Sequence, residues 1–296
     1  MPRDVALNDN FFPGFKCYDI DTSGARIRCR VGGTGSPLLL LHGSPQTHVM
    51  WRKVAKILEP HFTIVVCDLR GYGDSSKPRG SSDHEPYSKR AMAKDMVEVM
   101  DTLGFPSFHV AGHDRGGRVA HRLALDHRLR VNRVAALDIA PTREMYAKTS
   151  AEFARAYWHW FFLIQPSPLP ETMIAADVDQ YFSRNNPEPV EADARAARAE
   201  YLRCFRDPAT IHAMCEDYRA AATIDLRHDD EDNGLLVDPP LLALWGADGV
   251  INRCFDVEAL WRTRARDVTA VELPGGHHFA EQRPESVARE LLAFFR

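Results

Sequence analysis

The sequence predicts an α/β fold: a mostly parallel sheet with helices on both faces and a helical cap inserted between two halves of the core. Short, continuous apolar runs recur along the chain, as expected of strands that are buried on both faces. Each run is followed by Gly, Pro or Asp and then by a helix-like stretch, and this alternation favours parallel strands. The runs span residues 38–41, 63–67, 108–111, 134–137, 241–245 and 268–273.

The middle of the chain differs from the rest. Residues 147–229 are rich in aromatic residues, Ala, Arg and Glu, and they contain no convincing strand. Residues 190–203 (VEADARAARAEYLR) have high helix propensity. We therefore expect a first core segment at 1–146, a helical cap at 147–229 and a second core segment at 230–296. A plain helical continuation of the core is the alternative.

The composition argues against several classes of protein. Among 296 residues, 41 acidic side chains outnumber 37 basic ones, and the net charge of -4 offers no overall attraction to nucleic acid or to an anionic membrane. There is no run of 18 apolar residues and no apolar signal-peptide core. The six cysteines form no C-x-x-C pair, so we expect neither a zinc site nor a disulfide framework, and a cytoplasmic location. No cofactor or metal is expected, and the expected partner is a small molecule.

The strand expected at 108–111 runs directly into the sequence GHDRGG at 112–117. This stretch has the small-x-nucleophile-x-small form of a sharp strand-to-helix turn that displays a catalytic nucleophile. Glycines permit the close backbone approach that such a turn requires, and the N-terminus of the following helix favours negative charge. Asp114 takes the nucleophile position. The structural alternative is an Asp that only caps the helix.

An aspartate in this position predicts ester chemistry at a saturated carbon. Asp is ionised at neutral pH and attacks without a base, but water must then cleave the ester, which requires a His base and an acid that orients it. The segment LPGGHHF at 273–279 offers His277 and His278 near the end of the chain. We favour His277 because it directly follows the Gly-Gly turn and completes the order nucleophile, acid, base.

Two acids compete to orient the histidine. Asp138 follows the run 134–137 in the segment LDIAPT, and Asp248 follows the run 241–245 in the segment WGAD. Both positions lie at the carboxyl end of an expected parallel strand, where α/β folds place their chemistry. The residues alone leave both candidates open.

A third segment, HGSP at 42–45, follows the first apolar run. In folds of this kind the backbone N–H after the Gly joins the N–H after the nucleophile to form an oxyanion hole. We therefore expect the backbone N–H groups of Ser44 and Arg115 to stabilise the tetrahedral intermediate of ester hydrolysis. An ordinary Gly-Ser-Pro turn is the alternative.

Arg115 and Arg118 follow the nucleophile by one and four residues. Three residues apart at the start of a helix, they lie on one face. Two guanidinium groups beside a carboxylate indicate capture of a second carboxylate, which belongs to the substrate.

Taken together, these segments resemble the fluoroacetate dehalogenases of the α/β-hydrolase superfamily, and the resemblance covers nearly the whole chain. GHDxGG alone is shared with epoxide hydrolases; the cap segments and the arginine pair make the set more specific. The segments that carry the resemblance are HDRGGR (113–118), HGSPQTHVMW (42–51), LRGYGDSSKP (69–78), LDIAPT (137–142), ARAYWHWFFL (154–163), RDPATIHAMCEDYRA (206–220) and LPGGHHF (273–279).

The resemblance implies hydrolysis of a small haloacid, such as fluoroacetate to glycolate and fluoride, through an ester on Asp114. It implies that His277 is the base and Asp138 its partner, which selects Asp138 over Asp248. It assigns the substrate carboxylate to Arg115 and Arg118, and it implies a homodimer. The halide-binding residues that it implies are His159, Trp160 and Tyr218.

The sequence departs from the family pattern in two places. Ser44 stands where the family has Phe (HGFP), and the cap is shorter at 184–189, without the Trp that family members can carry there. Both changes bear on the range of substrates. The rival hypotheses are a non-enzymatic receptor and an epoxide hydrolase, which needs two cap tyrosines to protonate the epoxide oxygen. The candidates are Tyr157, Tyr181, Tyr201 and Tyr218.

Overall fold

The structure is a computed structural model and describes residues 2–5 and 11–296. Within these residues, nine strands form one sheet in the order β1-β2-β3-β5-β4-β6-β7-β8-β9. The strands are β1 (Arg3–Asp4), β2 (Lys16–Asp21), β3 (Arg26–Gly33), β4 (Ser36–Leu41), β5 (Phe62–Cys67), β6 (Phe108–His113), β7 (Val131–Leu137), β8 (Leu241–Gly246) and β9 (Val268–Leu273).

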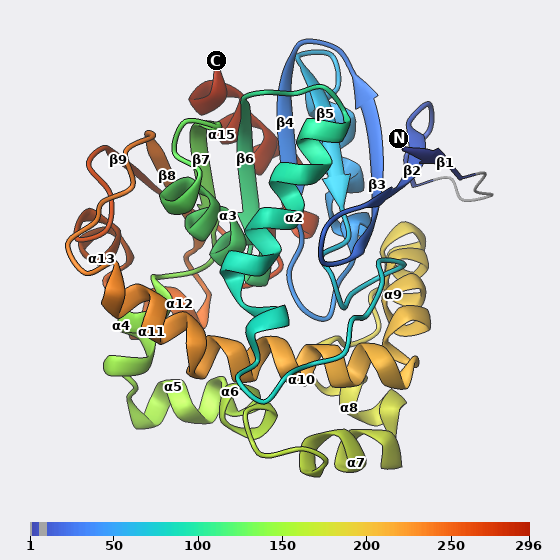
Figure 1. Ribbon diagram of the computed structural model, residues 1–296, viewed down its shortest axis with the longest axis vertical. Helices are drawn as coiled ribbons and strands as arrows, with labels where there is room; N and C mark the ends of the chain where they lie inside the picture. Colours follow the sequence, from blue (N-terminus) through green and yellow to red (C-terminus); the bar gives the residue numbers. More distant parts are fainter. Residues whose placement is uncertain (1, 6–10) are drawn as a thin grey trace.

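The six strands from β4 to β9 pair in parallel, and they are the six that the apolar runs predict. The side chains of β4 to β8 are largely buried on both faces because helices cover the sheet on both sides, whereas only Val268 and Leu273 of the edge strand β9 are buried. Helices α2 (Lys89–Thr102) and α3 (Arg115–Asp126) lie in front of the strands in Figure 1, and α15 (Pro284–Phe295) lies behind them, in contact with α1 (Arg52–Leu58). The predicted fold class is confirmed.

The antiparallel strands β1, β2 and β3 extend one edge of the sheet. They were not predicted, because β1 has only two charged residues and charged residues interrupt the apolar positions of β2 and β3. In β3, Arg26, Arg28 and Arg30 alternate with Ile27 and Cys29. This period of two is typical of a strand with two different faces, and it contains no continuous apolar run.

Only helices occupy the chain between the end of β7 and residue 231. Figure 1 shows them gathered at one end of the sheet, with α10 running across that end. The helix predicted at 190–203 is present as α9, two residues later. These helices are α4 (Thr142–Ala147), α5 (Ala151–Ala156), α6 (Trp158–Leu163), α7 (Leu169–Ala176), α8 (Val178–Asn185), α9 (Ala192–Phe205), α10 (Pro208–Ala222) and α11 (Ile224–Glu231).

After the helical segment the chain adds strands β8 and β9 to the sheet, together with three short helices. These are α12 (Val250–Cys254), α13 (Val257–Arg262) and α14 (Phe279–Gln282); two 3-10 turns, η1 (His48–Trp51) and η2 (Glu85–Tyr87), lie earlier in the chain. The carboxyl ends of the parallel strands therefore face the helical segment, so the loops after β4, β6, β7, β8 and β9 open toward it (Figure 1). Of the helices in the described part of the chain, none is long and apolar enough to cross a membrane.

Candidate active site

Asp114 lies on the turn between β6 and α3, with φ 48° and ψ -114°. Positive φ is uncommon for a residue with a Cβ atom, and such strain is concentrated at functional sites. The turn is tight because glycines allow the strand, the helix and the neighbouring loop to touch. A Cβ at Gly112 would lie 2.2 Å from the carbonyl oxygen of Gly116, and a Cβ at Gly116 would lie 2.5 Å from that of His42.

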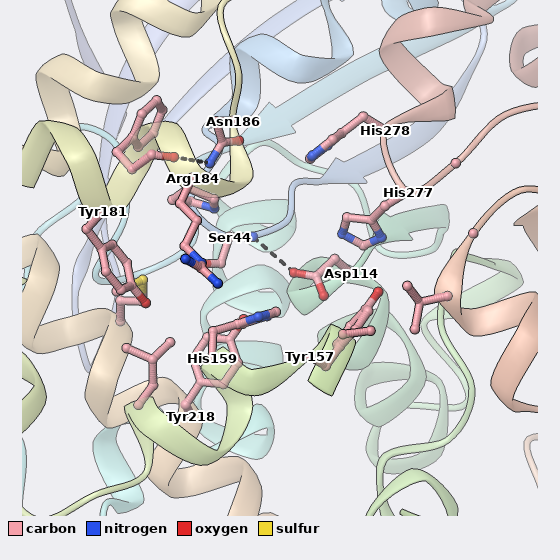
Figure 2. A pocket seen from close by; sticks show the side chains of 18 of the residues that line it. Ser44, Asp114, Tyr157, His159, Tyr181, Arg184, Asn186, Tyr218, His277 and His278 are labelled. Carbon is pink, nitrogen blue, oxygen red and sulfur yellow. Dashed lines mark hydrogen bonds between the residues drawn. The ribbon is translucent and has the colours of Figure 1, made fainter. Parts of the chain in front are cut away.

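His277 and Asp138 form a hydrogen-bonded pair beside this turn. His277 Nδ1 lies 2.6 Å from Asp138 Oδ2, and the other oxygen of Asp138 accepts a hydrogen bond of 3.1 Å from the backbone N–H of Gly246. Asp138 is fully buried at the end of β7. Figure 2 shows the His277 ring facing the carboxylate of Asp114. The geometry thus brings together Asp114, Asp138 and His277.

The two competing residues take other places. Asp248 is exposed, and its carboxylate accepts a hydrogen bond of 3.2 Å from the backbone N–H of Gly275 rather than one from a histidine. His278 is half-buried, its buried Nδ1 has no hydrogen-bond partner among the described residues, and desolvation lowers its pKa to about 3. Of these two histidines, only His277 therefore has a carboxylate partner that orients it.

Neighbouring charges shift the pKa values of both Asp114 and His277. Burial raises the pKa of Asp114, but the positive charges of His277, Arg115 and Arg118 lower it by a larger amount. The resulting pKa is about 2. Burial lowers the pKa of His277, but its hydrogen bond to Asp138 and the negative charges of Asp138 and Asp114 together outweigh this effect and leave the pKa above 6.5. Asp114 is therefore a carboxylate at any physiological pH, ready to attack without a base.

One positioning residue was not predicted from the sequence. The ring of His113 is fully buried, and its Nε2 donates to the carbonyl oxygen of His277 over 2.8 Å. Burial and the neighbouring His277 lower the pKa of His113 to about 4, so the ring is neutral at neutral pH. This bond ties the loop that carries the base to the strand that carries the nucleophile.

The backbone of Ser44 lies against the nucleophile. Its N–H donates to Asp114 Oδ1 over 3.1 Å (Figure 2), and Arg115 opens helix α3 on the other side of the same residue. The two backbone N–H groups predicted to form an oxyanion hole therefore flank Asp114.

Arg115 is anchored from behind by a carboxylate on α10. Its Nε and Nη2 donate to Asp217 over 2.8 and 2.6 Å, and its guanidinium stacks 4.2 Å from the centre of the Tyr218 ring. Asp217 also pairs with Lys89 and accepts a hydrogen bond of 2.7 Å from the hydroxyl of Tyr72. Among the described residues, the buried Nη1 of Arg115 has no hydrogen-bond partner.

Arg118 is anchored by neutral groups. Its Nη1 donates to Thr142 Oγ1 over 2.8 Å, its Nη2 lies 3.3 Å from Met145 Sδ, and its guanidinium packs 4.7 Å from the centre of a ring of Trp160. In the described part of the chain, its buried Nε has no partner. Each arginine therefore keeps one buried nitrogen without a partner among the described residues, Nη1 of Arg115 and Nε of Arg118, which the sequence does not reveal.

The three residues of the expected halide pocket lie together on α6 and α10. The ring of Tyr218 lies 5.9 Å from that of His159 and 6.3 Å from that of Trp160. His159 Nδ1 and Trp160 Nε1 are buried and have no hydrogen-bond partner among residues 2–5 and 11–296. Burial lowers the pKa of His159 to about 4, so its ring is neutral. A neutral imidazole and an indole can both donate a hydrogen bond.

A cavity of about 410 Å³ connects these groups (Figure 2). Ser44, Asp114, His277 and Asp248 are among the residues that line it from the core, and the opposite wall belongs to the helical segment. Arg115, Arg118 and Trp160 are not part of its lining. The guanidinium of Arg115 stacks on the ring of Tyr218, which is part of it. Residues of the helical wall include Tyr157, His159, Tyr181, Arg184, Asn186 and Tyr218.

Comparison with known proteins identifies the family. The model of the alpha/beta hydrolase fold family matches residues 36–283. The chain belongs to this family. In alpha/beta hydrolases the nucleophile, the acid and the base follow one another along the chain, and Asp114, Asp138 and His277 have this order.

Three relatives show which members of this family the chain resembles. A fluoroacetate dehalogenase from Burkholderia sp is 45% identical over 96% of this chain and 94% of its own length. A soluble epoxide hydrolase from Corynebacterium sp. (strain C12) is 33% identical over 92% of this chain and 94% of its own length. A solved alpha/beta hydrolase structure from Nostoc sp PCC 7120 has 54% identity and a TM-score of 0.92, covering 95% of this chain and 98% of that one. The predicted resemblance to fluoroacetate dehalogenases is confirmed.

Proposed function

We propose that this alpha/beta hydrolase is a haloacid dehalogenase, which cleaves the carbon–halogen bond of a small haloacid through an ester on Asp114. The observation that carries the proposal is a pair of buried guanidinium nitrogens, on Arg115 and Arg118, that have no partner among the described residues and belong to arginines close to an ionised nucleophile. Unpaired buried donors on two cations favour an anionic ligand. A carboxylate that accepts from both would hold the adjacent carbon of a haloacid in front of Asp114.

In the first step, a carboxylate oxygen of Asp114 attacks the carbon that bears the halogen. A carbon–oxygen bond forms, the carbon–halogen bond breaks, and the halide leaves with the electron pair. The groups proposed to receive it are His159 Nδ1, Trp160 Nε1 and the Tyr218 hydroxyl, each of which can donate to developing negative charge. Fluoride is strongly hydrated, so donors that replace its water shell favour its departure.

In the second step, water cleaves the ester at the carbonyl carbon of Asp114. His277 accepts a proton from the water, and Asp138 stabilises the resulting imidazolium. The backbone N–H groups of Ser44 and Arg115 stabilise the oxyanion. The hydroxyacid leaves with an oxygen that belonged to Asp114, and the water oxygen stays on the enzyme, so the balance is haloacid plus water to hydroxyacid, halide and a proton.

A second candidate function is epoxide hydrolysis with the same nucleophile. Tyr157, Tyr181 and Tyr218 all line the cavity, which supplies the two cap tyrosines that this reaction needs, and the Corynebacterium relative is named an epoxide hydrolase. A neutral epoxide, however, would leave the buried N–H groups of Arg115 and Arg118 without an acceptor. We therefore place dehalogenation first.

The helical segment completes the proposed site. We propose that residues 147–229 act as a cap between core segments 1–146 and 230–296, because the halide-binding candidates all come from that range. The cytoplasmic location and the homodimer remain predictions.

Halide release from chloroacetate and fluoroacetate, measured beside the hydrolysis of styrene oxide, tests the proposal. We expect halide from at least one haloacid and little diol from the epoxide, and no halide from an Asp114→Ala variant. Diol without halide would favour the epoxide hydrolase. Full halide release by Asp114→Ala would refute both functions.

A further inference from the structure

The cavity is larger than a haloacetate requires. Fluoroacetate has five non-hydrogen atoms, whereas the cavity of about 410 Å³ lies in the range of ~300–1,000 Å³ that holds ligands of drug size. The small, polar Ser44 lines it on the core side. Space therefore remains beyond the reacting carbon, between the nucleophile and the outer wall that α8 and the residues after it provide.

That outer wall carries a guanidinium. Arg184, near the end of α8, lines the cavity, and Figure 2 shows its side chain pointing into the space in front of Asp114 and His159. Its one contact of note is with the ring of Trp158, whose centre lies 5.0 Å away. Among the described residues, it makes no ion pair and no hydrogen bond.

The acidic side chains that flank Arg184 in the sequence form ion pairs with other arginines. Asp179 pairs with Arg206, and Glu188 pairs with Arg198. The remaining carboxylate on the cavity wall other than the nucleophile belongs to Asp248, which lies on the core side next to the loop of His277. A second anionic group on a ligand would be repelled by Asp248 and attracted by Arg184.

Arginines therefore lie on two sides of the nucleophile. Arg184 lines the cavity directly. Arg115 and Arg118, close to Asp114 in the chain, lie outside the lining, and each has one buried nitrogen without a partner among the described residues. We propose that the enzyme accepts 2-halodicarboxylic acids, such as 2-chlorosuccinate, with the distal carboxylate paired to Arg184. This inference rests on the proposed dehalogenase function and specifies its substrate class.

The chemistry at the reacting carbon stays the same. Asp114 displaces chloride from carbon 2 of 2-chlorosuccinate, and hydrolysis of the ester by water gives malate, chloride and a proton. Arg184 takes no part in these bond changes; it determines which substituent the outer end of the cavity prefers.

The test compares chloride release from three substrates: chloroacetate, racemic 2-chlorobutyrate and racemic 2-chlorosuccinate. 2-Chlorobutyrate has a chain of the same length without the distal charge, so the ratio of kcat/KM for 2-chlorosuccinate to that for 2-chlorobutyrate isolates the charge. We expect Arg184→Gln to lower this ratio about tenfold, mainly through KM, as expected for loss of a charge-assisted hydrogen bond. High salt should lower the ratio of the unmodified enzyme in the same direction.

Arg206→Gln is the matched control, because Arg206 is an exposed arginine of the same region that pairs with Asp179 outside the cavity; we expect it to leave the ratio as it is. An unchanged ratio in Arg184→Gln would overturn the inference. So would an equal loss with all three substrates, which would mean that Arg184 holds the first carboxylate. Chloroacetate turnover without any 2-chlorosuccinate turnover would refute the inference and leave the dehalogenase intact, whereas no turnover of any substrate would refute the dehalogenase itself.

Discussion

Replacing Arg118 with methionine should separate activity from stability in this enzyme. Arg118 is a buried cation whose hydrogen bonds go to neutral groups, Thr142, Ala140 and Met145. In the described part of the chain, no carboxylate lies within ion-pair distance of it. Burial and the neighbouring Arg115 lower its pKa, which means that the fold pays a free-energy cost to keep this side chain charged.

Two effects of the substitution on stability oppose each other. The variant loses hydrogen bonds from a charged donor, which contribute ~1.5–3 kcal/mol each. It also loses the desolvation cost of a buried ion, which is several kcal/mol, and methionine fills a similar volume with apolar atoms. We therefore expect the free energy of unfolding to change by less than ~2 kcal/mol.

The effect on activity should be much larger. If the Nε of Arg118 donates to the substrate carboxylate, its removal costs ~1.5–3 kcal/mol of binding, a fall of about 10–150-fold in kcat/KM for chloroacetate. Halide release gives the kinetics, and urea denaturation gives the stability.

Arg122 provides the opposite control. It lies one turn further along α3, buried, and it pairs with Asp126, Asp229 and Asp232. Breaking such a buried pair costs ~3–5 kcal/mol, so Arg122→Met should lose stability and keep its KM. If Arg118→Met retains kcat/KM within about twofold, Arg118 does not bind the substrate; if it loses as much stability as Arg122→Met, Arg118 is needed for the fold.

Three further predictions concern the second chemical step. Asp138→Asn should lower kcat about 10³–10⁴-fold, by analogy with the loss of the orienting acid in other triads, while Asp248→Asn should stay within about threefold; similar losses in both would reject the choice of Asp138. In His277→Asn the ester should form and persist, so mass spectrometry after exposure to chloroacetate should find one carboxymethyl group on the peptide that contains Asp114; an unmodified peptide would contradict the two-step scheme. Because the pKa of His277 is raised above 6.5 and the base must be neutral, steady-state turnover should rise with pH through a value above 6.5. The rapid first release of halide should persist at pH 5, since the pKa of Asp114 is about 2, and an acid limb with its midpoint below pH 6 would refute this assignment.

The parallel core could be predicted from the sequence because strands covered on both faces need continuous apolar runs. Runs such as LLLL in β4 and IVV in β5 therefore mark their strands. Strands β2 and β3 could not be found in this way, since charged residues interrupt their apolar positions and leave no continuous apolar run. Arg28 of β3 pairs with Asp19 of β2, and this pairing becomes visible only when the two strands lie side by side.

The site was predictable where one short segment carries the chemistry. GHDRGG fixes the turn around Asp114 locally, whereas the partner of His277 lies 139 residues away. Asp138 and Asp248 both follow strands, so the residues alone leave both open; the family resemblance favours Asp138, and the three-dimensional arrangement shows that its carboxylate reaches the ring. Asp217 was missed for the same reason, because its role depends on a contact between α10 and Arg115. Arg184 was missed because a single arginine near the end of a helix is, in sequence alone, typical of a solvated surface.

The central claim is that Asp114 attacks the substrate and water attacks Asp114. A single turnover of chloroacetate in water enriched in oxygen-18, with enzyme in excess, tests it directly. We expect glycolate to carry no label and the peptide containing Asp114 to gain one oxygen-18. Labelled glycolate with an unlabelled Asp114 peptide would mean that water attacks the substrate directly and that no ester forms on Asp114.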